Sequence, residues 1–276
     1  MGDGLRETSD REYRALVHGH EVHLWCVWPD DVTDLTLLTA YRALLSPDEI
    51  ARNQRFVFPK GRHEHLMTRA LVRTILSAYR PAVDPRAWQF VANPYGRPEI
   101  ARPTAQPVLR FNVSHTDGLI VCLLAADREI GVDVEDTTRA NIGLVEIADR
   151  YFSPTEVAAL GALPEAARPD RFFDYWTLKE SYIKARGLGL QLPLDQFSFH
   201  LGTQHPGTGE QIRISFGPGI DDDPATWQFS LRRLTARHRL AIAIRRQPDE
   251  ADLAIRIRPV VPLRPPPPPP ASTDAR

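Results

Sequence analysis

Two six-residue segments of the chain repeat each other, and this repeat limits what the chain can fold into. Ser46-Pro-Asp-Glu-Ile-Ala51 is restated by Ser153-Pro-Thr-Glu-Val-Ala158, 107 positions later. Each segment predicts the start of a helix, because the serine serves as N-cap, the proline suits the first helical position, and the glutamate closes a capping box. A capping box alone recurs by chance. The order of the flanking elements therefore decides whether the two segments belong to an internal repeat.

The predicted elements around the two segments follow the same order. In each half a strand precedes the capped helix, and an Arg-Phe pair (Arg55-Phe56 or Arg171-Phe172) precedes a longer helix. The predicted strands are residues 21–28, 88–91, 109–113 and 119–126, then 130–134, 197–201, 212–216, 227–234 and 239–244. We therefore expect an α+β fold of two similar lobes related by a pseudo-twofold axis, with a ligand cleft between them.

The repeat also sets the expected boundaries of the lobes. They are a polar N-terminal leader (1–20), an N-terminal lobe (21–128), a C-terminal lobe (129–250) and a proline-rich tail (251–276). The tail contains six consecutive prolines, Pro265 to Pro270, which predict a disordered polyproline II segment without a core of its own. A dispensable tail is favoured over a ligand for a proline-recognition domain.

Composition argues against several classes of protein. The formal net charge is −1 and 25% of the residues are charged, so a nucleic-acid-binding field is not indicated. The polar N-terminus lacks the apolar core of a signal peptide, and no apolar run approaches the length of a membrane span. Cys26 and Cys122 lie in apolar runs and are interpreted as buried thiols. We expect a globular protein of the cytoplasm.

The second long helix carries a charged pair beside an aromatic face. The stretch Trp176-Thr-Leu-Lys-Glu-Ser-Tyr-Ile-Lys-Ala-Arg-Gly-Leu-Gly-Leu190 predicts a helix that ends at Gly187. Glu180 and Lys184 are four residues apart, on the shoulder of the apolar stripe. An isolated pair of this kind is most often a solvated surface contact. The aromatic face and a second acidic cluster upstream favour a functional site here.

That acidic cluster is Gly131-Val-Asp-Val-Glu135. On a strand, Asp133 and Glu135 point to one face, and two like charges side by side need a cation or a donor. For these two alone, an exposed acidic strand face is an equal alternative. With Glu180 as a third carboxylate, the hard oxygen ligands favour Mg²⁺ held together with substrate phosphates. Zinc is not indicated, since no Cys/His spacing fits it.

Groups able to meet phosphate are present as well. Ser114-His115 opens a turn toward Gly118, where backbone N–H groups and an imidazole could meet an anion, although a capping serine and a surface histidine fit the pattern too. Arg97 lies in the turn Asn93-Pro-Tyr-Gly-Arg-Pro98, which presents it at a fixed place. The helices of the first half add a basic face, for which solvated charge is the default, from Arg52, Arg55, Lys60, Arg62, Arg69 and Arg73.

Three ordered motifs resemble the signature of the Sfp-type 4′-phosphopantetheinyl transferases. They are Phe111-Asn-Val-Ser-His115, Ile130-Gly-Val-Asp-Val-Glu135 and Trp176-Thr-Leu-Lys-Glu-Ser-Tyr-Ile-Lys184, with Asn93–Pro98 and Arg55-Phe-Val-Phe58 as weaker upstream motifs. The resemblance covers residues 20–245 and implies a two-lobed monomer. It further implies transfer of the 4′-phosphopantetheine arm of coenzyme A to a serine of an apo acyl or peptidyl carrier protein, with release of 3′,5′-ADP.

Position by position, the resemblance also implies roles for the site residues. Asp133, Glu135 and Glu180 would hold Mg²⁺ with the coenzyme A pyrophosphate. Glu180 would also activate the carrier serine as general base, directly or through a water, and Lys184 would steady the pyrophosphate or the pantetheine phosphate. The nucleotide end would be contacted by Ser114, His115, Arg97, Arg52 and Arg62. Gly61 and His65 depart from the family's pattern, which leaves the details of the adenine and phosphate contacts open.

The chemistry fits these residues without the resemblance. Attack of a serine oxygen on phosphorus needs charge neutralisation, alignment and removal of one proton, which a metal, a lysine and a carboxylate supply. Three rivals stand behind the transferase: another Mg²⁺-dependent phosphoryl or phosphodiester enzyme, a module that only binds coenzyme A or a carrier, and a structural adaptor. The sequence does not specify the carrier, and the candidates include carriers of fatty acid, polyketide and nonribosomal peptide biosynthesis. Ile142, Leu144 and Val145 are candidates for its docking surface, although helix core is an equal alternative.

Overall fold

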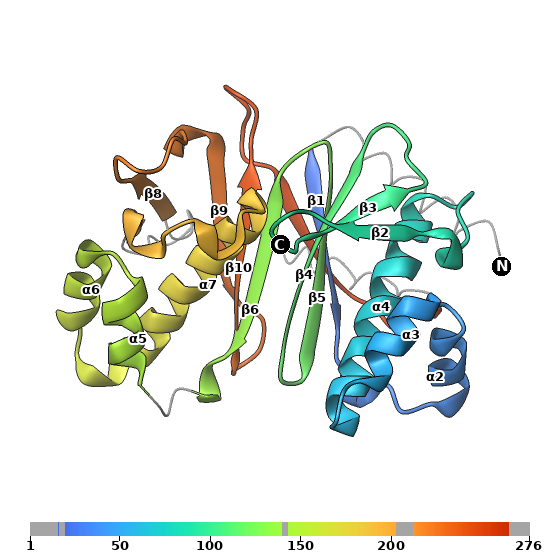
Figure 1. Ribbon diagram of the computed structural model, residues 1–276. Helices are drawn as coiled ribbons and strands as arrows, with labels where there is room; N and C mark the ends of the chain where they lie inside the picture. The colour runs from blue at the N-terminus through green and yellow to red at the C-terminus, as the bar shows by residue number, and fades with distance from the viewer. Residues whose placement is uncertain (1–15, 17–19, 140–142, 203–211, 265–276) are drawn as a thin grey trace, which may run out of the picture.

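The computed structural model describes residue 16 and residues 20–139, 143–202 and 212–264 (Figure 1). These residues form two lobes that lie side by side, with the long strands in the middle and helices on the two outer sides. Within them, no helix combines the length and the hydropathy that a membrane crossing needs.

Between residues 20 and 128, all of which the structure describes, the first lobe has three helices, a main antiparallel sheet and a separate hairpin. Along the chain these elements are β1 (Glu21–Val27), α2 (Leu35–Arg42), α3 (Pro47–Gln54), α4 (Pro59–Tyr79), β2 (Gln89–Ala92), β3 (Pro98–Arg102), β4 (Leu109–Thr116) and β5 (Leu119–Ala126). In the main sheet β5 lies between β1 and β4 and is antiparallel to both. The hairpin consists of β2 and β3.

The second lobe repeats this plan. Its elements are β6 (Ile130–Asp136), α5 (Leu144–Tyr151), α6 (Pro154–Gly161), α7 (Arg168–Arg186), β7 (Phe197–Leu201), β8 (Ile212–Phe216), β9 (Trp227–Arg233) and β10 (His238–Arg245). Short 3-10 turns connect the elements of both lobes: η1 (Pro29–Asp31), η2 (Pro85–Ala87), η3 (Thr137–Arg139), η4 (Glu165–Ala167), η5 (Gly189–Gln191), η6 (Leu194–Gln196) and η7 (Pro224–Thr226).

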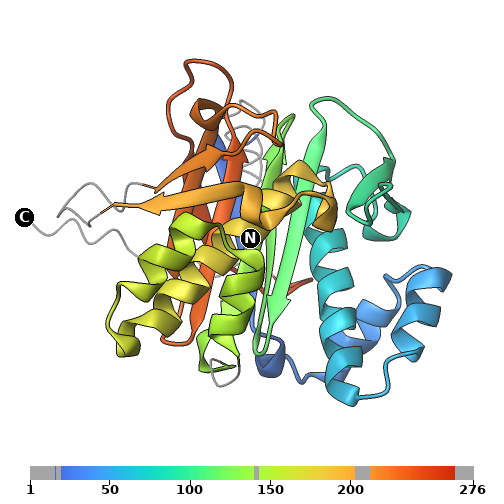
Figure 2. The same ribbon diagram turned by 60° about the vertical axis from the view of Figure 1, so that its left-hand side comes forward.

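The expected internal repeat is confirmed by the topology. The sheet order β1-β5-β4 of the first lobe matches β6-β10-β9 of the second, and each lobe has a capped short helix, a long helix and a separate hairpin. In Figure 2 the yellow-green and yellow helices of the second lobe lie in front of its red strands, and the blue and cyan helices belong to the other lobe. The predicted α+β class with two similar lobes is therefore confirmed.

The local signals that predicted the helix ends are confirmed as well. The side-chain oxygens of Ser46 and Ser153 accept from the backbone nitrogens of Glu49 and Glu156, and each glutamate carboxylate accepts from the backbone nitrogen of its serine. These reciprocal bonds satisfy N–H groups that the first helical turn leaves without partners. Gly187 ends α7 with φ of 65°, a left-handed conformation that glycine adopts without strain.

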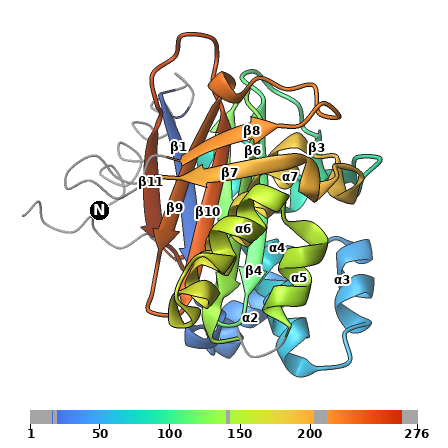
Figure 3. The ribbon, with the colours of Figure 1, turned by 90° about the vertical axis from the view of Figure 1, so that its left-hand side faces the viewer.

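The expectation of a structureless tail from residue 251 is wrong for its first part. Residues Ala254–Pro259 form β11, which pairs in parallel with β1 at the edge of the first lobe's sheet (Figure 3). The segment is fixed further along, where the Tyr41 hydroxyl donates to the carbonyl of Pro262 at 2.7 Å. The chain thus returns from the second lobe to the first. Residues 265–276, with the run of prolines, lie outside the described residues, as do residues 1–15 and 17–19 of the expected leader.

A third hydrophobic core lies between the two sheets and joins the lobes. It combines Leu24 and Leu123 of the first lobe with Val132 and Ile242 of the second, all fully buried. Burial of this apolar surface contributes roughly 25 cal/mol per Å². Cys26 belongs to the same core and Cys122 to the neighbouring one, and both are free thiols, as expected.

A buried ion pair fixes α7 to the rest of the second lobe. Lys179 Nζ lies 2.7 Å from Glu156 Oε2, and both side chains are almost fully buried. The ammonium also donates to the carbonyls of Leu194 and Phe197, each at 2.7 Å. Burial lowers the pKa of Lys179, and the charge of Glu156 opposes that shift. The pair therefore holds α7 by several bonds at once.

Lys179→Met is expected to destabilise the fold by about 3–5 kcal/mol, because Glu156 is left as an unpaired buried charge. Urea unfolding followed by circular dichroism measures the change. Arg86→Met is the matched control, since Arg86 pairs with Asp84 on the exposed surface and should have little effect. Equal destabilisation by the two variants would contradict a special role for the buried pair.

Candidate functional site

The seam between the lobes is closed by side chains rather than by a strand ladder. Strands β4 and β6 belong to different sheets. From Asn112 onward, every second side chain of β4 nevertheless accepts a bond from the β6 backbone. The N–H groups of Val132, Val134 and Asp136 donate to the side-chain oxygens of Asn112, Ser114 and Thr116, at 2.9, 3.3 and 3.1 Å. This polar row fixes the register of the two lobes and brings Ser114 beside Asp133.

Helix α7 packs directly on β6 at Gly131. A Cβ at this position would lie 2.0 Å from the carbonyl oxygen of Ser181 and 2.5 Å from the backbone nitrogen of Ala185. Only glycine permits such a close approach of the helix backbone to the strand. The contact therefore sets the height of Glu180 and Lys184 above Asp133.

Asp133 is the centre of the polar cluster that results. Its side chain is buried, and Oδ1 accepts from Lys184 Nζ at 2.6 Å and from Ser114 Oγ at 2.9 Å. Lys184 Nζ also donates to Ser114 Oγ at 3.0 Å. The second oxygen, Oδ2, is buried and has no hydrogen-bond partner among the described residues. One side of a buried carboxylate is therefore left for a ligand or a cation.

The electrostatics of Glu180 indicate the same need for positive charge. Burial raises the pKa of Glu180, the charge of Asp133 raises it further, and Lys184 lowers it. Two carboxylates thus share a half-enclosed site with one ammonium. A raised pKa makes a carboxylate a stronger base, and a bound cation would offset the repulsion between the acids.

Glu135 lies on β6 two residues after Asp133, half-buried and with interactions of its own. In the described part of the chain, no three His, Cys, Asp or Glu side chains are gathered closely enough to hold a metal ion. The predicted trio of Asp133, Glu135 and Glu180 is therefore close in the fold, but its side chains are not drawn together. The partnerless Asp133 Oδ2 fits a cation, and Lys184 supplies positive charge at Oδ1.

The predicted nucleotide-binding residues lie mainly on the first lobe. His115 is exposed near the end of β4. Arg52 is exposed and lines an open hollow of about 670 Å³ together with Asp48, Ala51, Arg55 and Phe56. Arg62 is exposed on the first turn of α4, where its Nε donates to the carbonyl of Phe56 at 2.7 Å. Among the described residues, none of these three side chains forms a hydrogen bond or ion pair with Asp133.

Arg97 is placed differently from the other basic residues. Its guanidinium donates to the carbonyls at the end of α7, across the seam, and to Glu99 on its own hairpin. Sequence analysis expected it beside a nucleotide. That pattern revealed the rigid turn but could not show what the turn faces.

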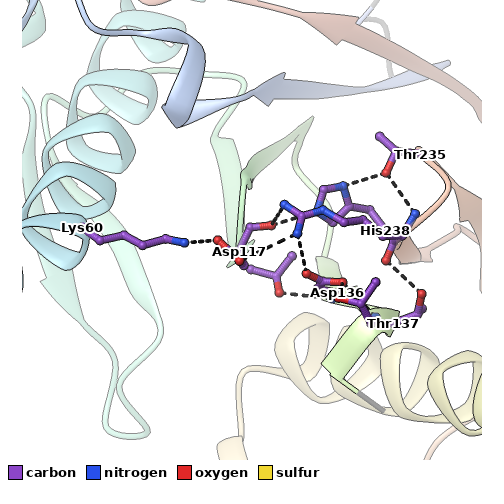
Figure 4. Close-up of polar contacts among 9 residues, drawn as sticks. Lys60, Asp117, Asp136, Thr137, Thr235 and His238 are labelled. Carbon is purple, nitrogen blue, oxygen red and sulfur yellow. Dashed lines mark hydrogen bonds and ion pairs between the residues drawn. The ribbon is translucent and has the colours of Figure 1, made fainter. Parts of the chain in front are cut away.

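A polar cluster around Asp117 makes a further contact between the lobes, which the sequence analysis missed (Figure 4). The Asp117 carboxylate pairs with Lys60 of α4, and its backbone carbonyl accepts from His238 Nε2 at 2.9 Å. Arg237 donates to the same carbonyl at 3.1 Å and to Asp136 Oδ2 at 2.9 Å. The turn between β4 and β5 is thus held from both lobes, and it supports the strand that carries Ser114.

Fold and site together define a class: an α+β protein of two repeated lobes, with an acid–lysine–serine cluster at their seam. Comparison with known protein families gives a match for each of the two lobes. Residues 31–128 match the model for the N-terminal part of 4′-phosphopantetheinyl transferases, and residues 129–244 match the model for the 4′-phosphopantetheinyl transferase superfamily.

Individual relatives have matching names. The 4′-phosphopantetheinyl transferase HetI of Nostoc sp. is 38% identical over 170 residues, which is 62% of this chain and 70% of that protein. The 4′-phosphopantetheinyl transferase Sfp of Bacillus subtilis is 34% identical over 161 residues, 58% of this chain and 68% of that protein. A phosphopantetheinyl transferase of Thraustochytrium sp. is 30% identical over 239 residues, 83% of this chain and 78% of that protein. The chain therefore belongs to the 4′-phosphopantetheinyl transferase superfamily.

Proposed function

We propose that this chain transfers the 4′-phosphopantetheine arm of coenzyme A to a serine of an apo acyl or peptidyl carrier protein. The observation that carries the proposal is the cluster at the seam, where Lys184 contacts both Asp133 and Ser114 and where Glu180 is held close by on the same helix. The similarity to HetI, Sfp and the Thraustochytrium protein, all named phosphopantetheinyl transferases, supports the same reaction.

In the proposed reaction the serine oxygen of the carrier attacks the β-phosphorus of the coenzyme A pyrophosphate. A new phosphorus–oxygen bond forms, the bond to the bridging oxygen breaks, and 3′,5′-ADP leaves. Glu180 takes the serine proton, for which a carboxylate with a raised pKa is suited. Lys184 stabilises the negative charge on the pyrophosphate, and Asp133 orients Lys184. Ser114 and His115 would meet the phosphate end of the nucleotide, with Arg52 and Arg62 on the basic face.

The chemistry of the carboxylates supports a divalent cation, which would have to draw their side chains together, since no three acidic side chains of the described residues are gathered closely enough to hold a metal ion. Asp133 would offer Oδ2, and Glu135 and Glu180 would complete an all-oxygen set of the kind that Mg²⁺ prefers. When bound, Mg²⁺ would neutralise charge on the pyrophosphate. We therefore propose Mg²⁺ as the cofactor and coenzyme A as the co-substrate.

The oligomeric state, the cellular location and the carrier are proposed from features of the sequence and the fold. A chain with both lobes supports a monomer, and buried free thiols support a cytoplasmic location. For the carrier, helix α5 presents an exposed Val145 beside a half-buried Leu144, and Ile142 lies outside the described residues. The carrier would belong to fatty acid, polyketide or nonribosomal peptide biosynthesis.

The test is the intact mass of apo carrier proteins incubated with this chain, coenzyme A and Mg²⁺. We expect a gain of one phosphopantetheinyl group on at least one acyl or peptidyl carrier, and EDTA should abolish it. No gain on any carrier, with coenzyme A still bound, would favour a binding module. Metal-dependent release of 3′,5′-ADP without a carrier would instead favour a hydrolase.

A further inference from the structure

The turn between β2 and β3 is internally braced. Asn93 Oδ1 accepts from the backbone nitrogens of Tyr95 and Arg97, each at 2.9 Å. The Asn93 nitrogen donates to the carbonyl of Arg97, also at 2.9 Å, and Gly96 takes the positive φ of 89° that the turn requires. Arg97 is therefore presented at a defined place rather than on a loose loop.

This turn of the first lobe reaches the carboxyl end of α7 in the second. Arg97 Nη1 donates to the carbonyl of Ala185 at 2.8 Å and to that of Lys184 at 3.4 Å. Asn93 Nδ2 donates to the carbonyl of Gly187 at 2.8 Å. The last carbonyls of a helix lack partners within it and carry partial negative charge, so a guanidinium is a suitable cap.

The contact leaves little freedom for the Arg97 guanidinium or for the end of α7. A Cβ at Gly187 would lie 2.5 Å from Arg97 Cζ, so the guanidinium lies directly against the helix end. Nη2 of Arg97 bonds to Glu99 Oε1 at 2.7 Å, which holds the guanidinium plane from the opposite side. Both terminal nitrogens are thus engaged with protein groups.

We infer that Arg97 is a positioning residue for Lys184: together with Asn93, it caps α7 from the other lobe and so fixes the last helical turn. Lys184 is on that turn, and its ammonium must reach Asp133 and Ser114 together, at 2.6 and 3.0 Å. Loss of the cap would let the turn fray and would misplace the ammonium. The activity readout of this inference rests on the proposed transfer reaction.

The test compares Arg97→Met with Arg110→Met. Arg110 is the matched control, because it also faces Glu99, at 3.8 Å, but is exposed on β4 and, within the described residues, has no hydrogen bond or ion pair to α7. We expect Arg97→Met to lower kcat by roughly 10- to 100-fold, in line with a small misplacement of a catalytic group. The affinity for 3′,5′-ADP should stay close to that of the wild type. Arg97→Lys, which keeps one donor, should recover part of kcat.

Amide hydrogen exchange supplies a readout that does not depend on the reaction. Exchange at residues 184–187 should accelerate in Arg97→Met and not in Arg110→Met, even in a chain that transfers nothing. A large loss of 3′,5′-ADP affinity with unchanged kcat would make Arg97 a nucleotide ligand and overturn the inference. Unchanged kcat with only a lower Tm would also overturn it, because Arg97 would then serve stability alone.

Discussion

Glu180→Gln is expected to remove most of the transfer activity while coenzyme A binding is less affected. The amide keeps the size of the side chain and one oxygen but cannot accept a proton. General-base catalysis contributes typically about 10²–10⁴-fold, so kcat should fall by about that factor. Burial and the charge of Asp133 raise the pKa of Glu180, which is the property a base near neutral pH needs. Formation of holo carrier measures kcat, and calorimetry measures coenzyme A binding.

The control for this variant is Glu165→Gln, which removes an exposed carboxylate from η4. It should retain wild-type turnover. Full activity in Glu180→Gln would show that Glu180 is not the general base. A loss of coenzyme A binding as large as the loss of turnover would assign Glu180 to binding instead.

Gly131→Ala is expected to impair both folding and turnover. The added methyl would overlap the carbonyl of Ser181 and the backbone nitrogen of Ala185, at 2.0 and 2.5 Å. Neither is the end of a flexible side chain, so α7 must move away from β6. Overpacking of this kind costs about 1–3 kcal/mol, and a shift of about 1 Å between catalytic groups can cost about 10²-fold in rate. Urea unfolding and kcat of the folded fraction measure the two effects.

Gly161→Ala is the matched glycine control. Apart from its chain neighbours and the backbone of its own helix, no atom of the described residues lies within 4 Å of the Cβ that it would add, and its φ is not in the positive range. This variant should be neutral or slightly stabilising, because alanine reduces the entropy of the unfolded chain. If Gly131→Ala folded and turned over as well as Gly161→Ala, the close approach of α7 to β6 would not set the site.

Features with local causes could be predicted from the sequence. Both capping boxes depend on residues three positions apart, and the end of α7 depends on Gly187 alone, so short segments contain the whole signal. The proximity of Asp133 to Lys184 followed from the ordered motifs. The alternation of Asn112, Ser114 and Thr116 along one strand is a local sign of the polar seam, whose partner strand only the fold shows.

Features with long-range causes were missed. Residues 254–259 alternate arginine with isoleucine and end in proline, and they become a strand only because β1 offers an edge more than 200 positions earlier in the chain. The bonds of Arg97 to a helix end in the other lobe could not be predicted from its turn either, and its contact with the nucleotide, which the resemblance implies, stays a prediction. Tertiary context decided both cases.

The measurement that tests the central claim most directly is the ratio of 3′,5′-ADP released to holo carrier formed, in one reaction with coenzyme A and Mg²⁺. The proposed transfer predicts one 3′,5′-ADP for each modified carrier, with both products lost together in Glu180→Gln. Release of 3′,5′-ADP without modified carrier would contradict transfer and would make the cluster of Asp133, Glu180 and Lys184 a hydrolytic site.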